Sequence, residues 1–140
     1  MHRPSPKSHL IILFFLIALA FPFVSLADSS NSPASISGWV WNDWDEDGLR
    51  DPEEPLLQDV LIVLANAKGD ILAHTYTDAD GAYSFEGLDA GSYILFETDP
   101  QGYSSSTPNV VPIQLEEGEQ VQVSFGDVLT LPGCFRTVSG

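Results

Sequence analysis

The chain has 140 residues and a formal net charge of −15 at pH 7, from twenty Asp and Glu residues against five Lys and Arg. Such a surplus of negative charge repels nucleic-acid phosphates and anionic membrane surfaces, so both are excluded as partners and cations are favoured. The length suits one domain with one hydrophobic core.

Residues 1–27 are predicted to be a secretory signal peptide. A basic start precedes an apolar run over residues 10–26, and Ser25 and Ala27 place small residues at the −3 and −1 positions of a cleavage after residue 27. The run approaches the length of a membrane-spanning helix, but Pro22 interrupts it and favours cleavage. We therefore expect a secreted, extracellular protein, associated with the cell surface or free, with no membrane contact after cleavage.

The rest of the chain divides into three segments. Residues 28–34 are rich in Ser, Asn and Pro and are predicted to be an exposed linker, residues 35–128 a single domain, and residues 129–140 a C-terminal tail. Cys134 is the only cysteine and lies in the tail, so no disulfide within the chain stabilises the domain.

The domain is predicted to be all-β. Seven short segments rich in apolar and β-branched residues are separated by Gly, Asn and Asp turn signals, which favours a single β-sandwich. The predicted strands are 36–41, 60–64, 71–77, 82–85, 92–96, 110–115 and 121–125.

The segment 43–54 has the spacing of a loop that wraps a calcium ion. Oxygen-bearing side chains occupy positions 1, 3, 5, 9 and 12, the residue at position 7 offers its backbone carbonyl, and Gly48 at position 6 permits the sharp turn. Calcium is a hard cation that takes six to eight oxygens, which this set can supply. The candidate ligands are Asp43, Asp45, Asp47, Leu49, Asp51 and Glu54, of which Glu54 is expected to be bidentate.

The residues around the loop distinguish it from an EF-hand, which needs a helix on each side. The segment 36–41 before the loop is typical of a strand, and Pro52 and Pro55 obstruct a helix at its end. Seven of the twenty acids lie between Asp43 and Glu54. Their mutual repulsion destabilises a compact fold unless a cation neutralises it, which is an argument for a metal independent of the motif.

An ordered series of motifs extends over residues 35–128. It comprises Ile36-x-Gly38-x-Val40-Trp41, the acidic loop ending in Glu54-Pro55, Val60-x-Ile62-x-Leu64, Thr77-Asp78-x-Asp80-Gly81-x-Tyr83-x-Phe85, Leu88-x-x-Gly91-x-Tyr93 and Gly102-Tyr103. On these motifs the chain resembles the SdrD B-like domains, the calcium-binding modules of serine-aspartate-repeat surface adhesins. It departs from their pattern at Leu56, where glycine is usual.

The resemblance implies a prealbumin-like or immunoglobulin-like Greek-key sandwich that binds several calcium ions and serves as a structural spacer or adhesion module on a bacterial surface. It places the five acidic loop residues on the family's ligand positions. It places Asp78 and Asp80 on a second acidic motif, which holds either a further ion or a hydrogen-bonded hairpin turn.

Three alternatives fit the sequence less well. The sequence contains no Ser-His-Asp arrangement and no His-rich metal site, so no enzymatic activity is expected. A lysine isopeptide crosslink is rejected, because Lys68, the only lysine after the leader, lies in a predicted turn. A glycan- or protein-binding sandwich is the alternative, with an extracellular ligand on Trp39, Trp41 and Trp44 if these are exposed; burial of the tryptophans is the more usual outcome.

Overall fold

The computed structural model describes residues 32–130, which form nine β-strands and no helix. None of these residues belongs to a helix that could cross a membrane. The predicted leader and Cys134 of the predicted tail lie outside the described residues. The strands are β1 (Ala34–Asn42), β2 (Leu61–Asn66), β3 (Ile71–Tyr76), β4 (Ala82–Leu88), β5 (Gly91–Thr98), β6 (Tyr103–Ser105), β7 (Val110–Leu115), β8 (Gln120–Gln122) and β9 (Phe125–Leu129).

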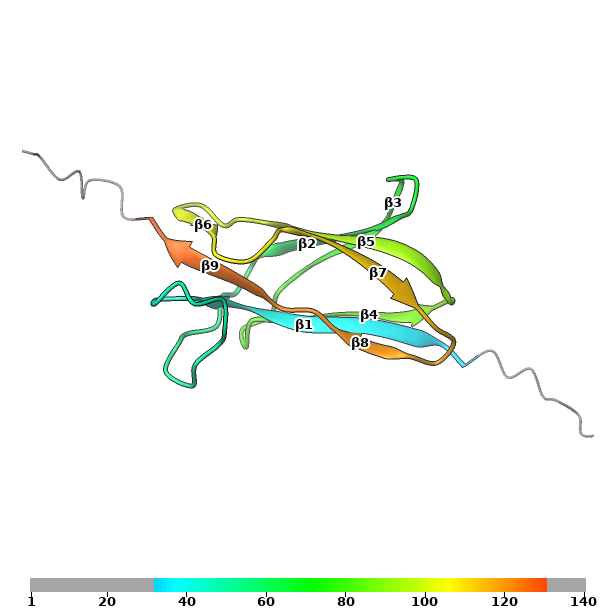
Figure 1. Ribbon diagram of the computed structural model, residues 1–140, viewed down its shortest axis with the longest axis horizontal. Helices are drawn as coiled ribbons and strands as arrows, with labels where there is room; N and C mark the ends of the chain where they lie inside the picture. The colour runs from blue at the N-terminus through cyan, green and yellow to red at the C-terminus, as the bar shows by residue number, and fades with distance from the viewer. Residues whose placement is uncertain (1–31, 131–140) are drawn as a thin grey trace, which may run out of the picture. The chain divides into compact units, whose positions relative to one another are not determined.

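The strands form two sheets packed face to face (Figure 1). One sheet has the order β4-β1-β9-β6, with β8 also paired to β1, and the other has the order β3-β2-β5-β7. Apolar side chains alternate inward along strands such as β2, β4 and β7, as a two-layer sandwich requires, whereas the edge strand β3 is largely exposed. The prediction of an all-β sandwich is therefore confirmed. The core consists of Ala34, Ile36, Val40, Val60, Ile62, Leu64, Tyr83, Phe85, Leu95, Ile113, Leu115 and Phe125.

Strand β1 is the centre of the larger sheet. It pairs antiparallel with β4 on one side and parallel with both β8 and β9 on the other. The single strand predicted over 121–125 is wrong in this detail, because the chain steps between β8 and β9. At the step Val123 still donates its N–H to the carbonyl of Ser37 (2.8 Å), but the hydroxyl of Ser124 accepts from the N–H of Trp39 (3.2 Å) in place of a backbone carbonyl.

Glycine is required at position 38 of β1 by the approach of this step. A Cβ atom there would lie 1.6 Å from the carbonyl oxygen of Val123. Tyr83 of β4 donates its hydroxyl to the same carbonyl oxygen from the neighbouring strand. The contact therefore joins β1, β4 and the segment between β8 and β9 at one point.

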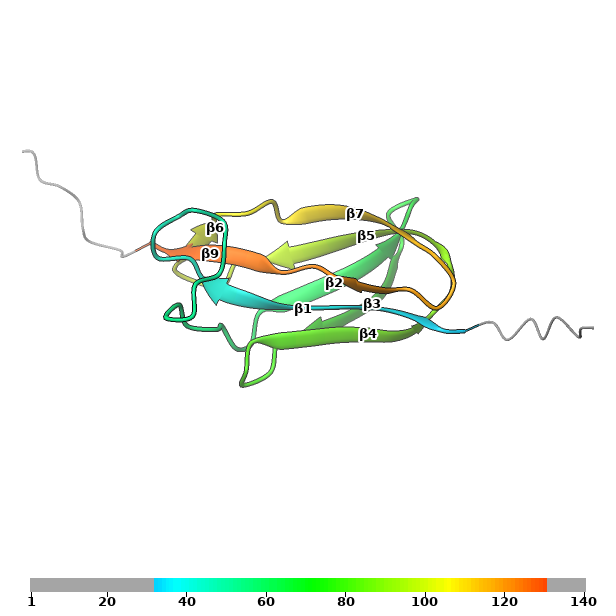
Figure 2. The same cartoon turned by 60° about the horizontal axis from the view of Figure 1, so that its bottom comes forward.

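The described chain enters the sandwich at one end and leaves it at the other. Residues 35–37 of β1 pair with β8 and residues 40–42 pair with β9, so the last strand continues in the direction in which the first one runs. Figures 1 and 2 show the start of β1 and the end of β9 at opposite ends of the domain. The segment 43–60 leaves β1 at the end where β9 also finishes, and it crosses to β2 in the other sheet.

Candidate metal centre

The acidic loop is anchored at its base by backbone hydrogen bonds to β1 and β9. The N–H of Asn42 donates to Pro55 (2.8 Å) and the N–H of Leu57 donates to Val40 (2.8 Å), so the end of the loop returns beside the strand from which it started. The N–H of Asp43 donates to the carbonyl of Asp127 on β9 (2.8 Å). The first ligand position is thus fixed by the sheet itself.

The structure brings the first three predicted ligands together. One carboxylate oxygen each from Asp43, Asp45 and Asp47 lies within 4.8 Å of the others. Asp43 is fully buried, whereas Asp45 and Asp47 are exposed. Two oxygens on opposite sides of a calcium ion are about 5 Å apart, because each Ca–O distance is about 2.3 to 2.6 Å. The three oxygens therefore have the separation of ligands to one ion.

Backbone amides hold these carboxylates in place. Asp43 accepts from the N–H of Gly48 (2.9 Å) and of Asp47 (3.2 Å), and Asp47 accepts from the N–H of Leu49 (2.7 Å). The turn that makes these bonds needs a φ of 75° at Gly48, in the region that glycine adopts without strain. The glycine at loop position 6 was expected for this reason.

Glu54 closes the loop. Its side chain is 4% exposed, and its two carboxylate oxygens accept hydrogen bonds from opposite sides of the loop, Oε1 from the N–H of Trp44 (2.7 Å) and Oε2 from the N–H of Asp51 (2.9 Å). Asp51 and Leu49 are exposed. Neither Glu54 nor Asp51 belongs to the group of oxygens within 4.8 Å, so their coordination of an ion stays a prediction.

The electrostatics of the loop favour a cation. Burial raises the pKa of the Asp43 carboxyl, but the hydrogen bonds that it accepts, including those from Gly48 and Asp47, outweigh burial and lower this pKa below its usual value. Desolvation, followed by the nearby charges of Asp47 and Glu54, raises the pKa of Asp45. Asp43 is thus held ionised. The neighbouring carboxylates repel one another, and a divalent ion would relieve this repulsion.

The donor chemistry of the loop fits calcium. All candidate ligands are carboxylate or carbonyl oxygens, which hard cations prefer, whereas zinc prefers nitrogen and sulfur ligands. Such an ion would be held by Asp43, Asp45 and Asp47, and by Glu54 if it rotates from its amide partners.

Asp78 and Asp80 form a hairpin turn between β3 and β4. Asp78 Oδ1 accepts from the N–H of Asp80 (2.8 Å) and of Ala82 (2.9 Å), and the N–H of Gly81 donates to the carbonyl of Asp78 (2.9 Å). Asp80 is exposed, and neither acid belongs to a group of three ligand atoms within the described residues. The arrangement matches the hydrogen-bonded turn, one of the two readings that the sequence left open.

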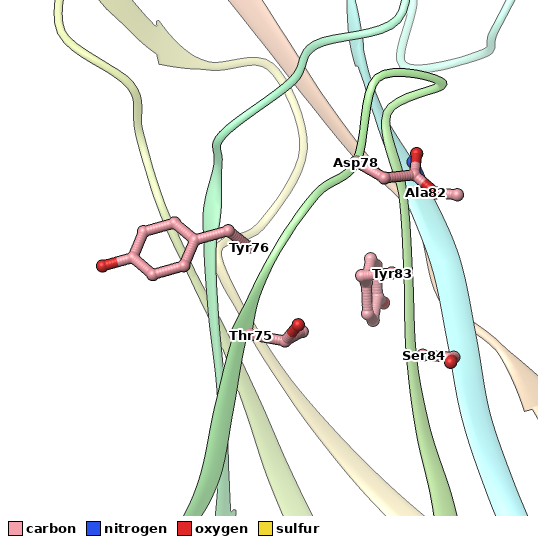
Figure 3. A pocket seen from close by; sticks show the side chains of 6 residues that line it. All are labelled: Thr75, Tyr76, Asp78, Ala82, Tyr83 and Ser84. Carbon is pink, nitrogen blue, oxygen red and sulfur yellow. The ribbon is translucent and has the colours of Figure 1, made fainter.

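A hollow of about 320 Å³ lies beside this turn, between the edge strands β3 and β4 (Figure 3). It is lined by Thr75, Tyr76, Asp78, Ala82, Tyr83 and Ser84. Its acid, Asp78, is already bonded to turn amides, and Figure 3 shows the ring of Tyr76 directed away from Tyr83. The hollow therefore does not gather ligand groups as the acidic loop does.

The three tryptophans do not form a common stacking surface. Trp41 is 4% exposed, Trp39 is half-buried, and Trp44 in the loop is 61% exposed. With the Asn42 amide oriented to satisfy both of its groups, its oxygen accepts from Trp44 Nε1 (2.7 Å). Trp41 is thus packed in the domain, and Trp44 alone of the three is exposed, so a glycan or protein ligand on these side chains stays a prediction.

The structure also contains an acidic cluster that sequence reasoning missed. One carboxylate oxygen each from Glu97, Asp99 and Asp127 lies within 4.8 Å of the others. Glu97 is 5% exposed and Asp127 is fully buried. Strand alternation predicts that two of these acids point inward. Glu97 lies two residues after the buried Leu95, and Asp127 lies two residues after the buried Phe125, so each faces the same side of its sheet. Sequence spacing does not bring Glu97 and Asp127 together, since they belong to different sheets.

The structure thus defines a β-sandwich module with an acidic loop between its first two strands. Residues 34–121 match the family model described as the SdrD B-like domain. The chain belongs to this family.

Proteins with similar sequences are much longer than this chain. Serine-aspartate repeat-containing protein F of Staphylococcus epidermidis is 35% identical over 95 residues, which cover 66% of this chain and 6% of that protein. The bone sialoprotein-binding protein of Staphylococcus aureus is 40% identical over 76 residues, which cover 54% of this chain and 7% of that protein. The chain therefore matches one small part of each relative.

Solved structures share the fold at low sequence identity. The minor pilin GBS52 of Streptococcus agalactiae superposes with a TM-score of 0.55 at 20% identity, covering 72% of this chain and 46% of that one. The Bacillus anthracis TIE protein gives a TM-score of 0.56 at 20% identity, covering 70% and 18%. These likenesses concern the sandwich architecture alone.

Proposed function

We propose that the protein is a secreted or cell-surface structural module of the adhesion type, whose sandwich is made rigid by calcium bound in the loop 43–54. The observation that carries this proposal is the convergence of the Asp43, Asp45 and Asp47 carboxylates within 4.8 Å. The role is non-catalytic: calcium binds, neutralises the acids and fixes the loop. Membership of the SdrD B-like family and the surface proteins among the relatives support this role.

The path of the chain through the domain supports a role as a spacer. Because β1 enters at one end and β9 leaves at the other, a pull on the two ends of the domain acts along the ladder between β1 and its parallel partners. The acidic loop begins at Asp43, directly beside the β9 end of that ladder. An ion in the loop would therefore stabilise the end at which the chain leaves the domain.

We expect Glu54→Gln to lower the calcium affinity of the purified protein at least tenfold, about 1.4 kcal/mol of binding free energy. The amide keeps the size of the side chain but removes the charge and the bidentate oxygen pair that calcium uses. Calorimetric titration with calcium measures the change. The control is Glu46→Gln, which removes one charge from the same loop at an exposed position.

Glu54 also accepts two backbone hydrogen bonds, so Asp45→Asn separates coordination from loop support. Asp45 is exposed and accepts one long hydrogen bond, from the N–H of Asp47 (3.3 Å). We expect Asp45→Asn to weaken calcium binding while leaving the melting temperature in chelator unchanged. Equal losses in Glu54→Gln, Asp45→Asn and Glu46→Gln would show that general negative charge, rather than coordination, attracts the ion.

A further inference from the structure

The cluster of Glu97, Asp99 and Asp127 lies between the two sheets, apart from the acidic loop. Glu97 is on β5 of the smaller sheet and Asp127 is on β9 of the larger one. Asp99 follows β5, and its Oδ1 accepts from Ser105 Oγ (2.8 Å) and Asn109 Nδ2 (2.6 Å). The three acids thus converge from the facing layers of the sandwich.

Two of the three acids in this cluster, Glu97 and Asp127, lack hydrogen-bond partners for their carboxylates. Both carboxylate oxygens of Glu97 and both of Asp127 are buried and accept no hydrogen bond. The amide oxygen of Asn109, whose nitrogen donates to Asp99, is also buried and unpartnered. Buried polar atoms are almost always satisfied in native proteins, and an unpaired buried charge is more costly still. The cluster therefore has the donors of a binding site without the partner that would satisfy them.

No basic side chain of the described residues can serve as that partner. Between residues 32 and 130 the Lys and Arg residues are Arg50 and Lys68, and both are exposed. His74 is exposed as well. Acids that face one another without a cation are forced either to hold protons or to bind a metal ion.

We propose that Glu97, Asp99 and Asp127 bind a second calcium ion, inside the sandwich and separate from the loop 43–54. The donors are all oxygens, which hard cations prefer. Their spacing within 4.8 Å matches ligands around one calcium ion, and the carboxylates of Glu97 and Asp127 are free to bind with both oxygens. Magnesium suits the cluster less well, because it keeps several of its waters and the side chains of Glu97 and Asp127 are buried.

Without a cation the three acids repel one another. Burial first, followed by the charges of Asp127 and Asp99, raises the pKa of Glu97 to about 8. Burial and the charge of Asp99 raise the pKa of Asp127 to about 7. A divalent cation would offset this repulsion and hold the carboxylates ionised.

The ion would connect the two sheets near the base of the acidic loop. The carbonyl of Asp127 accepts the N–H of Asp43, while its carboxylate belongs to the second cluster. Asp127 therefore supports the loop with its backbone and would bind the inner ion with its side chain.

The test is calcium binding by the purified full chain and by Glu97→Gln and Asp127→Asn, measured by equilibrium dialysis and calorimetric titration. We expect each variant to lose one bound ion, or to bind it at least tenfold more weakly, and to keep the ion of the loop. Asp45→Asn is the reciprocal control, which should weaken the loop ion and keep the inner one. Unchanged stoichiometry and affinities in both Glu97→Gln and Asp127→Asn would overturn the proposal.

A folding defect is separated from a binding defect by melting the same variants in chelator. Gln and Asn keep the size of the side chains and remove a buried charge, so the metal-free variants should melt no lower than the wild-type protein. In calcium, the wild-type melting temperature should rise further than theirs. Calcium binding lost only in Asp45→Asn would support the ion of the loop and overturn the inner ion. Calcium binding lost only in Glu97→Gln and Asp127→Asn would support the inner ion and contradict the ion of the loop.

Discussion

Removing calcium is expected to lower the melting temperature of the protein by several degrees or more. An ion that binds only the folded state adds about 2.7 kcal/mol of stability when its concentration is about 100 times the dissociation constant. This is a large share of the 5 to 15 kcal/mol that is typical of a domain. For a domain of this size each kcal/mol shifts the melting temperature by about 4 to 8 °C. Melting curves in calcium and in chelator measure the difference.

Limited proteolysis locates the effect in the chain. Without calcium the carboxylates of the loop 43–54 repel one another and only the amide hydrogen bonds hold the loop. Cleavage should therefore begin in this loop before it begins in any other part of the domain. The turn at residues 78–81 is the internal reference, because its acid is bonded to backbone amides and its protection should not depend on calcium. Identical melting curves and cleavage sites in calcium and in chelator would contradict a structural role for the ion.

The acidic loop could be predicted from the sequence because its ligands are local. Twelve consecutive residues carry the spacing, and the turn at Gly48 follows from the same residues. The structure adds what spacing could not show, namely that Asp43 is buried and bonded to β9, and that Glu54 accepts amides from both sides of the loop.

The inner acidic cluster could not be predicted because its members are far apart in the sequence. Glu97 and Asp127 meet only when β5 and β9 lie in facing sheets, and that depends on the topology of the whole domain. The alternation of each strand predicts that an acid points inward, but it does not indicate which other acid it faces.

The strand pattern was predicted well where strands are long and poorly where they are short. The sequence predicts no strand at β6, which has three residues, and predicts one segment where the structure has β8 and β9. The break between β8 and β9 leaves little local signal, because it depends on Gly38 of a strand that lies more than eighty residues earlier in the chain.

Replacing Gly38 by Ala is expected to destabilise the domain by about 3 kcal/mol, at the upper end of the usual cost of overpacking. The new Cβ would lie 1.6 Å from the carbonyl oxygen of Val123. Gly38 belongs to β1, and Val123 lies between β8 and β9 and is hydrogen-bonded to Ser37, so neither group can move alone. Separating them breaks the Val123–Ser37 and Trp39–Ser124 hydrogen bonds and displaces the hydroxyl of Tyr83. Denaturant unfolding of the variant measures the loss.

Gly69→Ala is the matched control for this variant. Gly69 has a φ of 90° and nothing within 4 Å of its added Cβ, so its replacement should cost only the conformational strain of about 1 to 2 kcal/mol. Gly38→Ala should exceed it, and should also lower calcium affinity, because the step at Val123 leads directly into β9 and Asp127. The contrary result would be a Gly38→Ala protein that is as stable as Gly69→Ala and binds calcium as the wild-type protein does. It would show that β8 and β9 can shift away from β1 freely, and that the pairing of β1 with these strands does not hold the metal sites in place.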